Sequence, residues 1–175
     1  MMSSTILKIL VYFFISTFCL SQSIINKNTF QKKDLHNKEF KPESYKKFTR
    51  AKSLEKAGLW EDAEKIYKEI NSDDPGNKKF FKPLKNILKQ RSEWDELIVY
   101  GSNYSKANNN DSSVKIELGE IYIWAGKVND AKKIFNSIIN YEKNNSNLIK
   151  IIIGIYANNG VFDEAEIILS KIRQS

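Results

Sequence analysis

The sequence predicts an all-α protein built from four tandem helix-turn-helix units. Turn residues recur every 34 positions, at Gly58, Ser92, Gly126 and Gly160. After each turn, small and apolar residues follow at helical spacing, so they share one face of a helix. No insertion breaks this period, and it divides the chain into the units 44–77, 78–111, 112–145 and 146–175.

The first unit shows the pattern clearly. Gly58 can adopt the positive φ that ends a preceding helix, and Pro75 cannot continue the following one. The residues predicted to share the buried face between them are Trp60, Ala63, Tyr67 and Ile70.

Where the two helices of a unit cross, close approach favours small side chains. The crossing pairs are Ala51 with Ala63, Gly119 with Ala131, and Ile153 with Ala165. In unit two the pair is Lys85 with Leu97, so we expect these helices to splay, with Lys85 extending its charge to water. Pro83 is expected to delay or kink the first helix of this unit.

The N-terminal segment differs from the repeats. Lys8 is its only charge, and the apolar run Ile9–Leu20 is followed by small polar residues. This layout predicts a signal peptide over residues 1–21, with cleavage near Gln22. The mature protein would then be periplasmic, envelope-associated or secreted. An uncleaved membrane anchor is the alternative, although the run is short of the roughly 20 apolar residues of a membrane span.

Composition excludes several classes of function. Cys19 is the only cysteine, and His36, the only histidine, lies in a polar linker over residues 22–43. The sequence therefore offers no disulfide, no thiolate metal site and no serine-histidine-acid set. With 28 basic and 21 acidic residues, the net charge of +7 is mild and lacks the basic stripe of a nucleic-acid binder. We expect no enzymatic activity, no metal and no cofactor.

The repeat resembles the tetratricopeptide repeat (TPR), a 34-residue helix-turn-helix unit. Unit three carries the best match, and unit one supplies the terminal proline of the family as Pro75. The matching residues of unit three are Leu118, Gly119, Tyr122, Ala125, Gly126, Asp130, Ala131 and Phe135. The resemblance implies a right-handed α-solenoid over residues 44–175, acting as a scaffold for protein–protein interaction.

In that family the first helices of the units line a concave groove, where a peptide or protein partner binds. The groove residues that the resemblance assigns to units two and three are Lys79, Lys82, Asn86, Lys89, Ile116, Glu120, Ile123 and Trp124. The basic stretch Lys78–Arg91 would suit a carboxylate or an acidic peptide, or it is only a solvated helix face. The three apolar members would form an exposed patch for partner side chains, unless Trp124 packs between repeats.

The sequence thus predicts an exported scaffold or adaptor without catalysis. The alternative is a repeat module of an envelope-associated enzyme or assembly whose chemistry lies elsewhere. A third interpretation is binding of an acidic polymer through Lys78–Arg91. Unit four carries a further feature, because its first helix, Leu148–Ala157, is apolar almost all round. We expect its outer end to be covered by a second copy, a partner or further sequence.

Overall fold

The computed structural model describes residues 42–143 and 145–174, and α-helix is the regular secondary structure throughout this part of the chain. The predicted signal peptide, the linker up to residue 41, Cys19 and His36 lie outside the described residues. The eight helices of the described part are α2 (Pro42–Lys56), α3 (Trp60–Asp73), α4 (Lys78–Gln90), α5 (Trp94–Ala107), α6 (Ser112–Trp124), α7 (Val128–Tyr141), α8 (Ser146–Asn158) and α9 (Phe162–Gln174).

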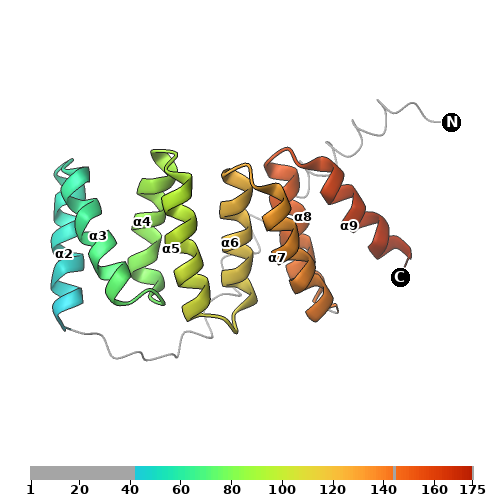
Figure 1. Cartoon of the computed structure of the whole chain (residues 1–175), viewed down its shortest axis with the longest axis horizontal. Coiled ribbons are helices and arrows are strands. Elements are labelled where there is room, and N and C mark those ends of the chain that lie inside the picture. Colours follow the sequence, from blue (N-terminus) through green and yellow to red (C-terminus); the bar gives the residue numbers. More distant parts are fainter. Residues whose placement is uncertain (1–41, 144, 175) are drawn as a thin grey trace. The chain divides into compact units, whose positions relative to one another are not determined.

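The helices form four consecutive pairs, and each helix packs on its neighbours in sequence (Figure 1). We call the first helix of each pair an A helix (α2, α4, α6, α8) and the second a B helix (α3, α5, α7, α9). Helices α4, α6 and α8 begin at positions 34 residues apart, as the repeat predicts, whereas α2 begins two residues before the expected boundary at 44. The all-α array of four helix-turn-helix units is therefore confirmed. No helix of the described part is long and apolar enough to cross a membrane.

The four A-to-B turns have one geometry. The turn residues Gly58, Ser92, Gly126 and Gly160 all have positive φ, between 58° and 78°. After each of them, the next residue donates its backbone N–H to a carbonyl five positions earlier, for example Leu59 to Leu54 at 2.9 Å. This is the Schellman ending, which satisfies the last carbonyls of each A helix.

The starts of three A helices are also periodic. The residue before each helix accepts a hydrogen bond from a backbone N–H of the first turn, which satisfies one donor at the helix end. The caps are Asn77 (from Lys79, 3.1 Å), Asp111 (from Ser113, 2.8 Å) and Asn145 (from Leu148, 3.3 Å). These three polar residues are 34 positions apart, so they mark the unit boundaries as regularly as the turns do.

The core consists of two clusters that meet at α6. Val114 and Ile121 of α6 pack with units one and two, whereas Ile116 and Ile123 pack with units three and four. Helix α6 is thus buried on two sides, because both neighbouring units lie against it.

Three expectations about individual residues are wrong, the one for Pro83 only in so far as it concerned a delayed start of α4. Trp60 is not on the buried face, because its side chain is about half exposed at the turn into α3. Pro83 does not delay α4, which begins at Lys78 and contains Pro83 at a buried position. Lys85 does not extend to water; it forms an ion pair with Glu117 of the next unit.

Candidate functional site

The outward side of α4 carries four of the predicted groove residues. Lys79, Lys82, Asn86 and Lys89 are all exposed and follow one another at steps of three and four along the helix. The opposite side of α4 is fixed in the core by Phe80, Phe81, Leu84, Ile87 and Leu88. Because one face of the helix is buried, the polar residues must face outward together. We call this surface, with the neighbouring residues of α6, the α4–α6 face.

Two lysines of this face lie over aromatic rings. The Lys89 Nζ is 3.4 Å from the centroid of the Trp124 ring, and the Lys79 Nζ is 5.1 Å and 5.7 Å from those of Tyr45 and Phe48. Both fall within the distance at which a ring attracts a cation. Within residues 42–143 and 145–174, neither the Lys82 nor the Asn86 side chain has an ion pair or hydrogen bond, so both can accept a ligand.

Acidic residues of α6 balance part of the positive charge. Glu117 holds Lys85 in an ion pair in which both side chains are mostly buried. Glu120 lies beside this pair, and burial raises its pKa above 4.5, although nearby Lys85 and Lys89 oppose the shift. The negative charge of Glu120 is therefore disfavoured by its surroundings. The α4–α6 face is therefore basic on its α4 side, whereas acidic residues of α6 offset the positive charge where the two helices meet.

The predicted apolar patch is not a surface. Ile116 and Ile123 are 5% and 6% exposed, because unit four packs against them in the second core cluster. Trp124 is partly buried against the first cluster and lies under the Lys89 ammonium. The expectation of three exposed apolar groove residues is thus wrong for the two isoleucines, and the site keeps its polar members and one aromatic ring.

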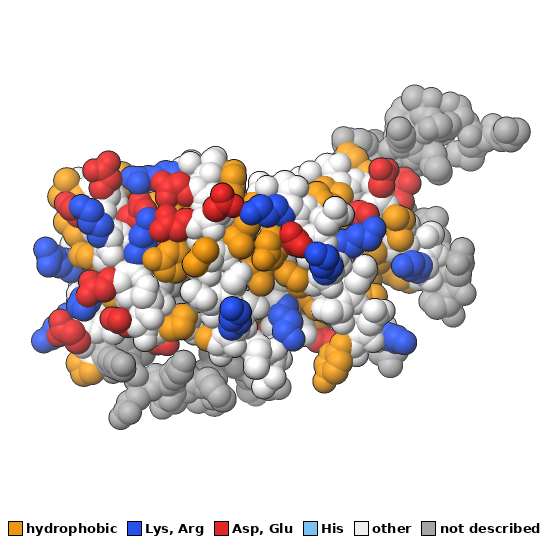
Figure 2. Space-filling view, viewed as in Figure 1, with side chains coloured by type: hydrophobic (Ala, Val, Ile, Leu, Met, Phe, Trp, Pro, Cys, Tyr) orange, Lys and Arg blue, Asp and Glu red, His pale blue; other side chains and the backbone are white. Residues whose placement is uncertain are grey.

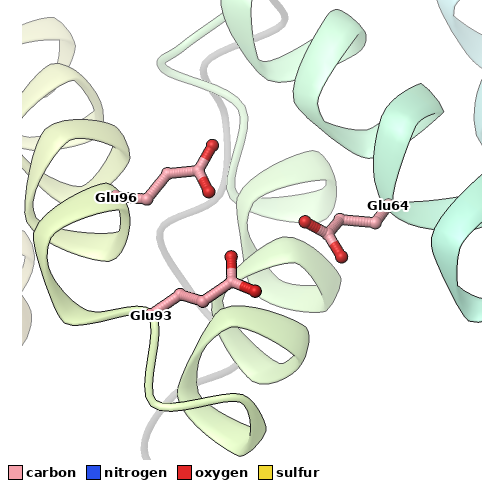
Figure 3. Close-up of side chains that lie close together, drawn as sticks. All are labelled: Glu64, Glu93 and Glu96. Carbon is pink, nitrogen blue, oxygen red and sulfur yellow. The ribbon is translucent and has the colours of Figure 1, made fainter.

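A separate charged cluster lies between units one and two, and the sequence reasoning missed it. Carboxylate oxygens of Glu64, Glu93 and Glu96 lie within 4.8 Å of one another, with the three side chains converging from α3 and from the start of α5 (Figure 3). Lys68 contacts Glu64 at 2.6 Å and Glu96 at 2.7 Å, and Arg91 contacts Glu64 at 2.7 Å. Two cations therefore already offset most of the negative charge of this cluster, and its arrangement does not indicate a metal site.

The pKa of Glu93 in this cluster is raised. Burial is the largest cause, the nearby Glu64 and Glu96 carboxylates add to the shift, and Lys68 opposes it. Glu96 lies in the first turn of α5, where an acidic residue stabilises the helix dipole, and Glu64 lies one residue beyond the first turn of α3. Their meeting in space depends on how units one and two stack.

A shallow depression of about 210 Å³ lies next to this cluster. It is lined by Trp60, Ile87, Gln90 and Arg91, none of which belongs to the α4–α6 face. On the side of the molecule in Figure 2, acidic and basic side chains lie intermixed over α3 and α5. The surface around the cluster is therefore of mixed sign, whereas α4 carries lysines and no acidic side chain.

A family-model match agrees with the helix-turn-helix repeat. A family model described as the PPR repeat matches residues 51–74, which is the turn between α2 and α3 with its flanking helices. Among solved structures, the chain is similar to "MamA AMB-1" (19% identity, 73% of this chain and 70% of that chain covered, TM-score 0.49). It is also similar to "MamA MSR-1" (18% identity, 75% of each chain covered, TM-score 0.49). No curated protein matches significantly.

Proposed function

We propose that the protein is an exported helical-repeat adaptor that binds an acidic segment of a partner protein on the α4–α6 face, without catalysis of its own. The observation that supports it most is the composition of α4, which has five lysines, no acidic residue and a fully buried apolar side. Export rests on the predicted signal peptide. The adaptor role rests on the array of four helical pairs, because such arrays expose long binding surfaces.

The chemistry of the face suits carboxylates. Lys82 and Asn86 lie one helical turn apart, and their side chains supply an ammonium group and an amide NH₂ group as donors. An ammonium group has three donors, so Lys89 can remain over the Trp124 ring and still donate to an incoming carboxylate. Lys85 is less available, because Glu117 already accepts from it.

A second feature sets the direction of binding along the face. Glu117 and Glu120 of α6 offset the charges of Lys85 and Lys89, whereas Lys82 has no ion pair within the described residues, so acidic groups of a partner are favoured toward Lys82 over α6. We therefore expect the acidic end of the partner segment to lie over the first half of α4. An apolar or basic part of the same segment would lie over α6.

Site-specific photo-cross-linking in the native host tests this proposal. A photoreactive amino acid replaces Asn86 in one strain and the exposed Lys65, on the B helix α3, in another. We expect discrete protein adducts from the Asn86 position only, with acidic segments at the cross-linked sites. Adducts equal at both positions, or adducts to RNA, would contradict the proposal; RNA is included because PPR repeats read single-stranded RNA.

A further inference from the structure

We propose that the outer end of unit four is an interface with a second copy of this chain, formed by the same end of each copy. One repeat position of the B helices differs in exposure between unit four and the other three units. Ile70, Tyr104 and Ile138 are 34 residues apart on successive B helices and are 0%, 4% and 3% exposed. Their counterpart in α9, Ile172, is 47% exposed.

The reason for this difference is stacking. In units one to three, the A helix of the following unit packs on the B helix that carries this position, and the residue belongs to a core cluster that includes residues of that A helix. Leu169 repeats the pattern, because its counterparts Tyr67 and Phe135 are fully buried, whereas Leu169 is only partly buried. The end of unit four therefore presents the apolar surface that elsewhere receives a helix. Exposed apolar surface of this kind favours association in water.

The opposite end of the array cannot be the occupant. A head-to-tail contact would place α2 of one copy on unit four of another, in the way that α4 packs on unit one. The residues of α4 that make this contact are apolar, for example Phe80 and Leu84. Their counterparts in α2 are Lys46 and Arg50, which are both exposed. A lysine and an arginine would have to be buried against the apolar end of unit four, which is strongly unfavourable.

The same end of a second copy avoids this conflict. Residues 146–175 contain three acidic residues (Asp163, Glu164, Glu166) and three basic ones (Lys150, Lys171, Arg173), so this unit is neutral in a chain of net charge +7. Two such ends do not repel each other. In a two-fold arrangement each surface meets itself, so Glu166 and Lys171, both exposed on α9, can approach charges of opposite sign.

Sedimentation velocity of the purified protein over a concentration series tests the proposal. We expect a reversible dimer, and we expect Ile172→Glu to weaken dimerisation at least tenfold, since the interface would bury a charge. Val99→Glu is the matched control, because Val99 lies on the B helix α5 at another repeat position and is 57% exposed.

Helical content by circular dichroism verifies folding, and Ile172→Lys repeats the test with the opposite charge. A wild-type protein that stays monomeric at the highest concentration would overturn the proposal. So would a dimer that both Ile172 variants leave unchanged, or one that Val99→Glu weakens equally.

Discussion

Gly119 of α6 lies directly under the ring of Phe135 in α7. A Cβ built on Gly119 would come within 2.3 Å of Phe135 Cε1, so no larger residue fits without a shift of the ring. Phe135 is fully buried and packs edge-on against Tyr156 of unit four, with ring centroids 5.1 Å apart. The close approach inside unit three thus also positions the ring that joins units three and four.

Gly119→Ala should destabilise the protein by about 1–3 kcal/mol, because the new methyl group overpacks this contact. Gly154→Ala is the matched control in α8, where an added Cβ would meet nothing within 4 Å. That substitution should stabilise by about 0.5–1 kcal/mol, since alanine loses less backbone entropy in a helix. Urea midpoints measure both, and the same sign for the two variants would contradict the packing at Gly119.

Ser92 is the one turn residue that is not glycine, and its φ is 58°. A side chain in this left-handed region carries strain, which glycine avoids. Ser92→Gly should therefore raise the free energy of unfolding by up to about 1 kcal/mol, after the added entropy of the unfolded chain is subtracted. Gly126→Ser, at the equivalent turn with a φ of 72°, should do the reverse. A thermal denaturation series on both variants checks this pair.

Glu55 and Glu120 should have opposite effects on stability at neutral pH. Burial alone would raise the pKa of Glu55, but hydrogen bonds from Lys52 and Tyr67 outweigh it and hold this pKa below 4.5. Its charge therefore stabilises the fold above pH 4.5, and this contribution is lost as the pH falls through the lowered pKa. Burial raises the pKa of Glu120 above 4.5, so its charge destabilises the fold once the pH exceeds that raised pKa.

Glu55→Gln should consequently lower the urea midpoint at pH 7, and Glu120→Gln should raise it. Both differences should shrink in acid below about pH 4, where the carboxyl groups of the unfolded chain are protonated. Urea midpoints of the wild type and both variants, measured from neutral to acidic pH, test these two expectations. A Glu120→Gln variant less stable than the wild type at pH 7 would show that its contacts with Lys85 and Lys89 dominate.

Export predicts a mature N-terminus near Gln22. N-terminal sequencing of the protein isolated from its native host would find this residue or a close neighbour. Protein that retains Met1 and fractionates with membranes would instead support the uncleaved anchor.

The period of 34 predicted the positions of the helices and turns because each unit repeats the same local chemistry. Gly58 and its counterparts end each A helix, so their spacing alone was sufficient to predict where the turns lie. The caps Asn77, Asp111 and Asn145 carry the same period, and a search for polar residues at unit boundaries could have found them.

The details of the α4–α6 face depend on contacts between units, which a period within one helix does not contain. Lys85 and Glu117 are 32 residues apart, and only stacking brings them into an ion pair. Ile116 and Ile123 occupy groove positions of the repeat, but whether they are exposed depends on how closely unit four approaches. The basic character of the face could therefore be predicted from the sequence, but which of its residues are buried could not.

The most direct test of the account is binding of a fluorescein-labelled polyglutamate peptide, followed by anisotropy. We expect saturable binding that weakens as salt is added, because the contacts join opposite charges near the surface. The double variant Lys82→Glu with Lys89→Glu should lose at least tenfold in affinity, whereas Lys65→Glu with Lys106→Glu, the same charge change on exposed B-helix lysines, should lose far less. Equal losses in the two double variants, or no binding by the wild type, would contradict an acidic-segment site on the α4–α6 face.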